Sequence, residues 1–153
     1  MPDSLTLQYW VTPDGNARHL MLCDHDGPPA TDMPGGDGSW SGEQILPGDL
    51  PSPAGAGGLL LNLMDVPPSH EDEFNDWYDS EHIPRFGEVE GVICARRFRS
   101  GHANPRYAAF YHLTTLDLLS SEAWKQAAST PWTARMRGIR FNNRRLTFVP
   151  IAG

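Results

Sequence analysis

Residues 77–84, with the sequence WYDSEHIP, contain the side chains best suited to proton transfer. Counted from Phe74, Glu81 and His82 follow at positions i+7 and i+8, which puts both on or beside the buried stripe of a helix. Burying a charged group is costly unless it is paired, so a titratable residue on such a stripe is a candidate for function. We therefore predict that His82, Glu81 and Asp79 are catalytic, with His82 as general acid or base.

The surroundings of His82 in the sequence also predict its charge. Pro84 lacks the amide proton that an interior helical residue would donate, and two glycines follow, so the helix is expected to stop in this region. The negative end of the helix dipole and the carboxylates of Asp79 and Glu81 would then favour the imidazolium. The alternative is structural: His82 caps its own helix by hydrogen-bonding a terminal carbonyl.

Other polar and aromatic side chains could bind a substrate. Asn62 and His112 interrupt apolar strands, where they point into a cavity or are hydrogen-bonded groups of the core. Arg96 and Arg97 lie on opposite faces of one strand, so at most one faces a cavity, where it could hold a carboxylate or enolate. The remaining arginines of the second half are interpreted as balancing the acidic first helix. The predicted substrate-binding residues are Trp77, Tyr78, Asn62, Arg97, Tyr111 and His112.

The sequence carries no cofactor fingerprint, neither a P-loop nor a dinucleotide glycine motif. His19, Cys23 and residues 24–26 form a possible metal cluster, but nothing fixes the geometry of 24–26, so we expect no metal and no cofactor. A haem held by one histidine would leave no signature, and that alternative stays open. Cys23 and Cys94 fit no metal or redox spacing, so we expect reduced thiols in the cytoplasm.

Charge and composition restrict the partners. The chain of 153 residues has a formal charge of −7, which disfavours nucleic acid and anionic membranes. It contains no apolar run long enough to span a bilayer, and its N-terminus lacks the pattern of a secretory signal. Residues 1–57 contain eight acids against one arginine, whereas 58–153 contain eleven charges of each sign. We therefore expect an N-terminal extension, 1–57, and a compact domain, 58–153.

The extension is predicted to be a β-hairpin followed by a loop. The β-prone runs SLTLQYWV and ARHLMLCD flank residues 12–16, TPDGN, whose Pro-Asp-Gly core favours a turn. Residues 24–57 contain eight glycines and six prolines and almost no hydrophobic periodicity. They should form a long surface loop, either a linker or a lid.

The compact domain has a regular pattern of strands and helices. Residues 58–64 predict a buried strand, and a helix with Ser69 as N-cap follows. A hairpin is predicted for residues 92–98 and 107–113. A second helix is expected to begin at Thr115 or Asp117 and to run to about residue 127, and the last strand is predicted for residues 140–149. The order β-α-β-β-α-β is that of a ferredoxin-like α+β fold, with both helices on one face of an antiparallel sheet.

This architecture leaves the second face of the sheet uncovered, although the first strand and residues 107–113 are apolar on both faces. The cover could be another subunit, the N-terminal hairpin, or stacked nucleobases. An RRM-like RNA-binding module is a remote alternative, because the stacking positions would hold Ala108 and Phe110 rather than two aromatic residues, and the chain is acidic.

Four short motifs stand in order along the compact domain: residues 77–84 (WYDSEHIP), 90–92 (EGV), 95–98 (ARRF) and 107–111 (YAAFY). Together they resemble the dimeric α/β-barrel superfamily, specifically its EthD-like branch, in a likeness that covers about residues 58–150. The resemblance implies two ferredoxin-like sheets facing each other in a homodimer, with a cavity between sheet and helices that the segment 77–84 borders. Residues 1–57 have no counterpart in the usual pattern.

Residues and resemblance together predict a small-molecule enzyme without a cofactor. We expect acid/base chemistry on an aromatic or polyketide-like carbonyl compound: cyclisation, dehydration, isomerisation or oxygenation, the work of a lyase, isomerase or monooxygenase. The main alternative is a non-catalytic dimeric protein that binds a ligand or stabilises a partner.

Overall fold

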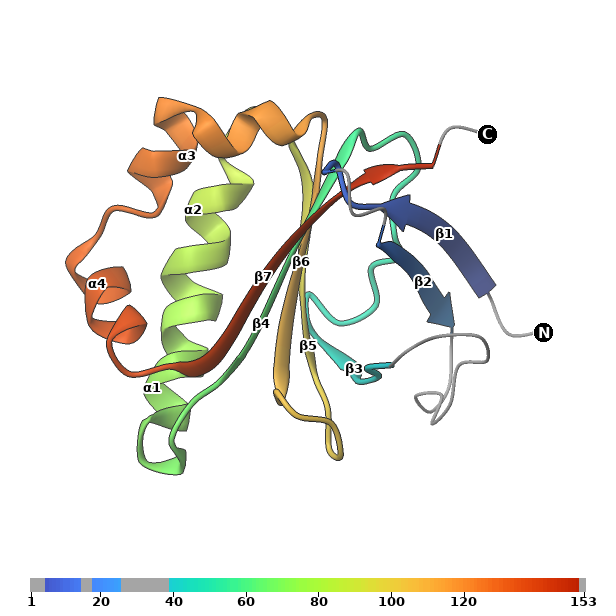
Figure 1. Cartoon of the computed structure of the whole chain (residues 1–153). Coiled ribbons are helices and arrows are strands. Elements are labelled where there is room, and N and C mark those ends of the chain that lie inside the picture. Colours follow the sequence, from blue (N-terminus) through green and yellow to red (C-terminus); the bar gives the residue numbers. More distant parts are fainter. Residues whose placement is uncertain (1–4, 15–17, 26–38, 152–153) are drawn as a thin grey trace.

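The computed structural model describes residues 5–14, 18–25 and 39–151, which form one curled antiparallel sheet with helices on one of its faces (Figure 1). The seven strands lie in the order β2-β1-β7-β4-β6-β5-β3. They are β1 (Leu5–Val11), β2 (His19–His25), β3 (Glu43–Leu46), β4 (Gly58–Asp65), β5 (Val92–Arg99), β6 (Tyr107–Leu113) and β7 (Phe141–Pro150). None of the helices in the described part of the chain is long and apolar enough to cross a membrane.

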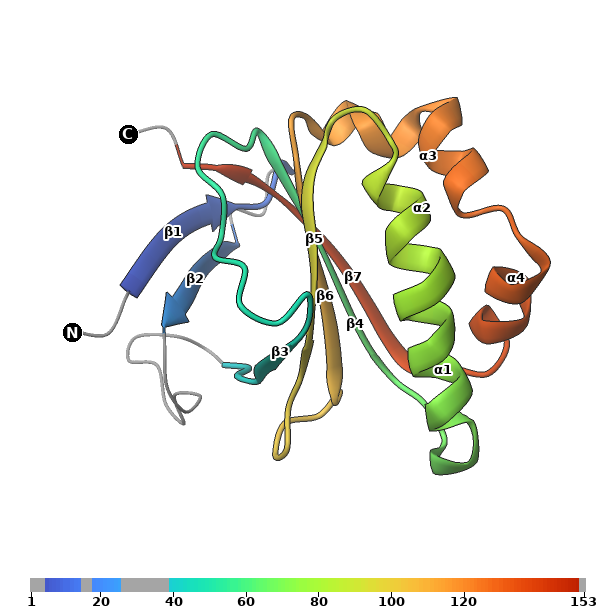
Figure 2. The ribbon, with the colours of Figure 1, turned by 180° about the vertical axis from the view of Figure 1, so that it is seen from behind.

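The predicted order of strand, helix, strand, strand, helix, strand is confirmed for the second half of the chain. Strands β7, β4, β6 and β5 are neighbours and pair antiparallel throughout. Figure 2 shows the helices together on one side of these strands. They are α1 (Glu71–Trp77) and α2 (Ile83–Gly87), joined by a π-helical turn (Tyr78–His82), then a 3-10 helix (Leu116–Ser120), α3 (Glu122–Ala127) and α4 (Pro131–Arg137).

The first helix ends in the predicted region, at Gly87, but it continues past Pro84, so His82 lies five residues before its end. It widens into the π turn, where the Ile83 amide donates to the carbonyl of Tyr78 five residues earlier, and then continues to Gly87. Pro84 occupies the first turn of α2, where a missing amide proton is tolerated. The predicted N-cap is also wrong: Ser69 belongs to a short 3-10 turn (Pro68–His70), and His70 precedes α1 without capping it through its side chain.

The two faces of the sheet are both buried, each in its own apolar cluster. Along β4, Leu60 and Met64 pack toward the helices, whereas Leu59, Leu61 and Leu63 pack on the opposite side. This alternation confirms that the central strands are apolar on both faces, as the sequence indicates.

The cover of the second face is the N-terminal segment of the same chain. Trp10 of β1 and Leu22 of β2 pack against Leu59, Phe110 and Phe148. The hairpin β1–β2 extends the sheet by pairing β1 with β7, and its predicted existence is confirmed. The apolarity of this face therefore no longer argues for a second subunit.

The covered face also removes the surface on which the remote RNA-binding alternative would stack nucleobases. Ala108 is 2% exposed and Phe110 is 7% exposed, so neither can stack on a nucleobase. Phe98 lies beside them, its ring 5.3 Å from that of Phe110.

A buried ion pair joins β2, at one edge of the curled sheet, to β5, which lies next to the other edge. Arg96 of β5, which is fully buried, donates to the carboxylate of Asp24 in β2 at 2.9 Å and to the Ser52 hydroxyl at 2.8 Å. The Ser52 amide also donates to Asp24. The apolar second face of the sheet is thus covered by residues of the same chain.

The segment predicted as one long loop is partly structured. Residues 26–38 lie outside the described part, but Glu43–Leu46 forms β3, which pairs with β5 at the edge of the sheet. Trp40 packs against the covered face and donates through Nε1 to the Pro105 carbonyl at 2.6 Å. This strand could not be predicted, because it has only four residues and lies in a segment rich in proline and glycine.

Candidate functional site

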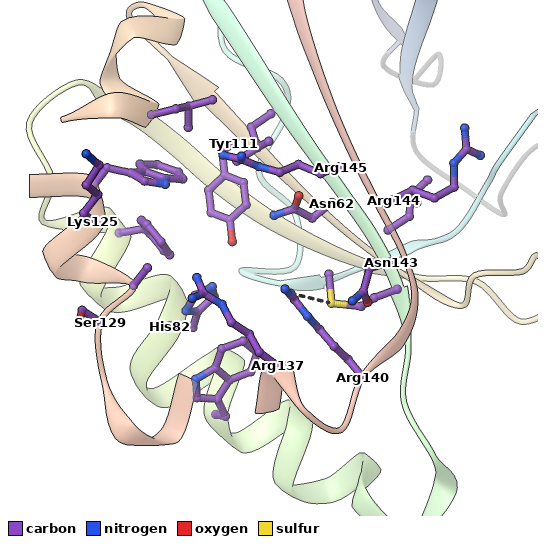
Figure 3. A pocket seen from close by; sticks show the side chains of 18 residues that line it. Asn62, His82, Tyr111, Lys125, Ser129, Arg137, Arg140, Asn143, Arg144 and Arg145 are labelled. Atoms are coloured by element: carbon purple, nitrogen blue, oxygen red, sulfur yellow. Dashed lines mark hydrogen bonds between the residues drawn. The ribbon is translucent and has the colours of Figure 1, made fainter. Parts of the chain in front are cut away.

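A cavity of about 470 Å³ lies between the helix-facing side of the sheet and the helices (Figure 3). Its size is typical of a site for a small organic molecule. Strands β4, β6 and β7 form one wall, and the π turn, α2, α3 and the end of α4 form the other. The lining residues of the first wall are Leu60, Asn62, Leu63, Met64, Tyr111, Asn143, Arg144 and Arg145, with Arg140 just before β7; those of the second are Trp77, His82, Phe86, Leu119, Trp124, Lys125, Ala128, Ser129 and Arg137.

His82 lies at the last position of the π turn and is 6% exposed. Its ring stacks on Trp77 at a centroid distance of 4.2 Å and meets the edges of Tyr78 and Phe86. Its Nδ1 atom is buried and has no hydrogen-bond partner among the described residues. The ring is therefore held by packing, with one nitrogen left uncommitted.

The structure overturns the prediction of a charged His82. Burial, and after it the positive charges of Arg137 and Arg140, lower the pKa of His82 to about 3. The groups expected to stabilise the imidazolium act elsewhere. The helix does not end at His82, Asp79 pairs with Arg97 at 2.7 Å, and Glu81 accepts a hydrogen bond from Thr130. His82 is thus neutral near pH 7, so it can accept a proton but has none of the acid strength that an imidazolium would supply.

His82 does not cap a helix end either, because the helix continues past it to Gly87. The structural alternative raised by the sequence is therefore wrong in that form. What holds the ring is the aromatic cluster around it, described above.

Three other predicted residues line the same cavity. Trp77 is fixed by a hydrogen bond from its Nε1 to the Thr133 hydroxyl at 3.1 Å. Asn62 projects from β4, and Tyr111 from β6 is 1% exposed with no partner for its hydroxyl within the described chain. Burial raises the pKa of Tyr111 well above its ordinary value, so its hydroxyl remains a donor.

The remaining predicted residues on the helix side lie behind the cavity wall rather than in it. Arg97 is 1% exposed, donates to Asp79 and Asn75, and stacks over Tyr78 at 4.3 Å. Tyr78 is buried beneath it, with its hydroxyl 3.7 Å from the Met64 sulfur. These groups support the helix that presents His82.

His112 belongs to the opposite face of the sheet. It contacts Trp10 edge-on, its Nε2 lies 3.0 Å from the Gln8 side-chain oxygen, and its Nδ1 lies 3.8 Å from the Cys94 sulfur. Burial lowers the pKa of His112 to about 4. The structure thus separates His112 from His82 by the thickness of the sheet.

The cavity also contains a group of cations that the sequence analysis missed. We call Lys125, Arg137, Arg140 and Arg145 the basic cluster; Arg144 borders the cavity as well but points away from its centre in Figure 3. The interpretation that the arginines balance acidic residues holds for Arg106 and Arg135, which pair with Glu71 and Glu73. The signal that could have revealed the cluster is the run Asn142-Asn143-Arg144-Arg145, which contains no acid.

The possible metal cluster is not assembled within the described residues, where no three His, Cys, Asp or Glu side chains are placed to hold an ion. Asp24 is engaged by Arg96 and Ser52. Asp26 and the side chain of His25 lie outside the described part.

Comparisons with known proteins show a likeness in fold. No family model matches the chain, and no curated protein matches it in sequence. Among solved structures, it is similar to a protein of Fusobacterium nucleatum named "Putative monooxygenase", with a TM-score of 0.50 and 12% sequence identity. The match covers 89% of this chain and 55% of that one, so the chain spans about half the length of this neighbour. At this identity the likeness concerns the curled α+β fold alone.

Proposed function

We propose that this protein is a small-molecule enzyme in which neutral His82 acts as general base on a carbonyl compound. The observation that carries the proposal is a buried, neutral imidazole set in the wall of a cavity of about 470 Å³. With its pKa lowered to about 3, His82 is a weak base until a bound group stabilises the imidazolium, so the proposal requires that the substrate supply this stabilisation. The name of the Fusobacterium protein supports a small-molecule enzyme but no particular reaction.

The arrangement supports removal of a proton from a carbon next to a carbonyl group. His82 takes the proton and becomes an imidazolium, while the electron pair moves onto the carbonyl oxygen to give an enolate. The Tyr111 hydroxyl, kept protonated by burial, and the Arg140 guanidinium can donate to that oxygen. Returning the proton at a different atom completes an isomerisation. In a dehydration, the enolate expels a β-hydroxyl group, which takes the proton from the His82 imidazolium and leaves as water.

We also propose that residues 58–150 are a ferredoxin-like unit related to the dimeric α/β-barrel superfamily and its EthD-like branch. The strand order β7-β4-β6-β5 with helices on one face supports this relationship. The N-terminal hairpin occupies the face on which a second sheet would pack, so the apolarity of that face does not support a homodimer. The homodimer is proposed from the resemblance alone.

A non-catalytic ligand-binding protein is the second candidate. It is favoured by the unpartnered Nδ1 of His82: a catalytic histidine is commonly oriented by a hydrogen bond from its second nitrogen to a carboxylate or carbonyl. The same cavity would then serve only to hold its ligand.

Solvent deuterium exchange distinguishes these functions. Phenylpyruvate and phenylacetone each carry a benzylic CH₂ beside a carbonyl, and proton NMR in D₂O follows the loss of that signal. We expect the protein to accelerate exchange in at least one of them and His82→Gln to reduce the acceleration about 100-fold or more. His112→Gln is the matched control, because His112 is also buried and neutral but lies across the sheet. Equal rates with and without protein, or equal losses in both variants, would contradict the base role.

A further inference from the structure

We propose that the ligand of this cavity is an anion, an aromatic or conjugated compound with a carboxylate that the basic cluster binds through Arg140 and Arg145. The binding site stands on its own observations; the statement that this anion is also the substrate rests on the proposed function. The inference assigns a substrate class that the fold likeness does not supply.

The charge of the cavity lining is entirely positive. Lys125, Arg137, Arg140, Arg144 and Arg145 border it, and no carboxylate does so among the residues described. The acids of the neighbouring helix point elsewhere: Glu73 pairs with Arg135, and Glu81 accepts from Thr130. In the described part of the chain, no salt bridge reaches any cation of the cavity.

Arg140 is the most informative of these cations. Its Nε is buried without a hydrogen-bond partner among the described residues, and its Nη1 lies 4.0 Å from the Met64 sulfur, a weak acceptor. Burial lowers the pKa of Arg140. A partly buried guanidinium without a counterion is unfavourable, because desolvation is not offset by an ion pair. A carboxylate can accept two parallel N–H bonds from such a group and supply the missing charge.

Arg145 reaches the same space from the sheet. Its register partner is Asn62, and residues directly opposite each other on antiparallel strands share a face. Because Asn62 faces the cavity, Arg145 does so too, and Figure 3 shows both side chains on the cavity side of β4 and β7. Arg144, one residue earlier, alternates to the other side.

The rest of the lining selects the body of the ligand. Trp77, Phe86, Tyr111 and Trp124 present aromatic surface, and Leu60 and Leu119 add aliphatic surface. A bare ion such as phosphate would leave these walls against water, whereas a planar organic anion covers them and still reaches the basic cluster. The lining is therefore complementary to an amphipathic anion.

The negative charge of the ligand also bears on His82. The arginines around the cavity oppose protonation of the imidazole, and an anion bound among them offsets their field. Binding of the anion would thus make His82 a stronger base and stabilise the imidazolium formed when it accepts a proton. Neutral analogues would bind without this effect, so the charge of the substrate would contribute to turnover as well as to affinity.

Isothermal titration of the full chain with 1-naphthoate, 1-naphthamide and inorganic phosphate tests the binding site. The two organic probes have nearly the same shape and differ in charge. We expect 1-naphthoate to bind at least 10-fold more tightly than either other probe. Arg140→Met should weaken 1-naphthoate at least 10-fold and leave 1-naphthamide unchanged, and Arg144→Met, the matched control, should change neither by more than about 3-fold.

Three results would overturn the inference: equal affinity for the two organic probes, no detectable binding of 1-naphthoate, or equal losses in Arg140→Met and Arg144→Met. Phosphate binding as tight as that of 1-naphthoate would overturn the assignment of an aromatic anion. If Arg140→Met does not fold by circular dichroism, Arg145→Met replaces it with the same expectation. His82→Gln should bind 1-naphthoate normally, so loss of deuterium exchange with retained binding would refute only the proposed function.

Discussion

Protonation of buried His82 provides a stability measurement that tests the chemistry proposed for it. The folded protein keeps His82 neutral, since burial lowers its pKa to about 3, whereas the unfolded chain takes up a proton below about pH 6.5. Acidification through this window therefore stabilises the unfolded state and lowers the free energy of unfolding. Above pH 6.5 both states carry neutral imidazole, and the effect vanishes.

The expected magnitude is set mainly by the unfolded state. At pH 5.5 an unfolded histidine is protonated in a ratio of about ten to one, which lowers the free energy of unfolding by about 1.4 kcal/mol relative to pH 7.5. His82 is 6% exposed and His112 is fully buried with its pKa lowered to about 4, so each should contribute nearly this full amount. The wild-type protein should lose about 2.8 kcal/mol from these two histidines.

Urea unfolding followed by tryptophan fluorescence at pH 7.5 and 5.5 measures the effect, at low protein concentration because the isoelectric point is about 5.2. His82→Gln should lose about 1.4 kcal/mol less than the wild type between the two pH values. His112→Gln should show the same reduction. An unchanged pH dependence in His82→Gln, or an NMR titration of His82 near pH 6.5 in the folded protein, would refute the neutral imidazole and with it the basis for a general base.

Two further predictions concern the N-terminal segment that covers the second face of the sheet. Trp10→Ala should lower the free energy of unfolding by about 3 kcal/mol, because it leaves a cavity against the sheet. Tyr9→Ala, at the neighbouring exposed position, should lower it by less than about 1 kcal/mol. Equal effects of the two variants in urea unfolding would argue against packing by Trp10. Asp24→Asn should lower the free energy of unfolding by about 3 kcal/mol, since fully buried Arg96 would lose its counterion, with exposed Asp76→Asn as the control. A loss below about 1 kcal/mol would show that the position of β2 against β5 does not depend on this ion pair.

The local pattern of the sequence was sufficient for the order of elements and for the burial of His82. Strand and helix periodicities are short-range properties, so the hairpin at the N-terminus, the strands of the second half and the helix carrying residues 77–82 could be predicted from neighbours in sequence. The same reasoning placed Asn62 and Tyr111 on strands, and the structure brings both into the cavity with His82.

The course of the chain around His82 could not be predicted in this way. A proline normally ends a helix because its missing amide proton leaves a carbonyl unpaired, but a π turn before Pro84 lets the helix continue. The sequence contains no pattern that distinguishes this outcome from a helix end. The expectation of a charged imidazole therefore placed the helix end at His82, five residues before the end at Gly87.

The sequence by itself determined which side chains lie on the buried faces of their own elements. Only the tertiary structure decided their charge and surroundings. The charge of His82 depends on Arg137 and Arg140, which arrive from the other end of the domain, and the cover of the second face depends on β1 and β2 folding back across the sheet. Desolvation and Coulomb interactions act through space, so groups more than fifty residues apart in sequence fix the chemistry of this cavity.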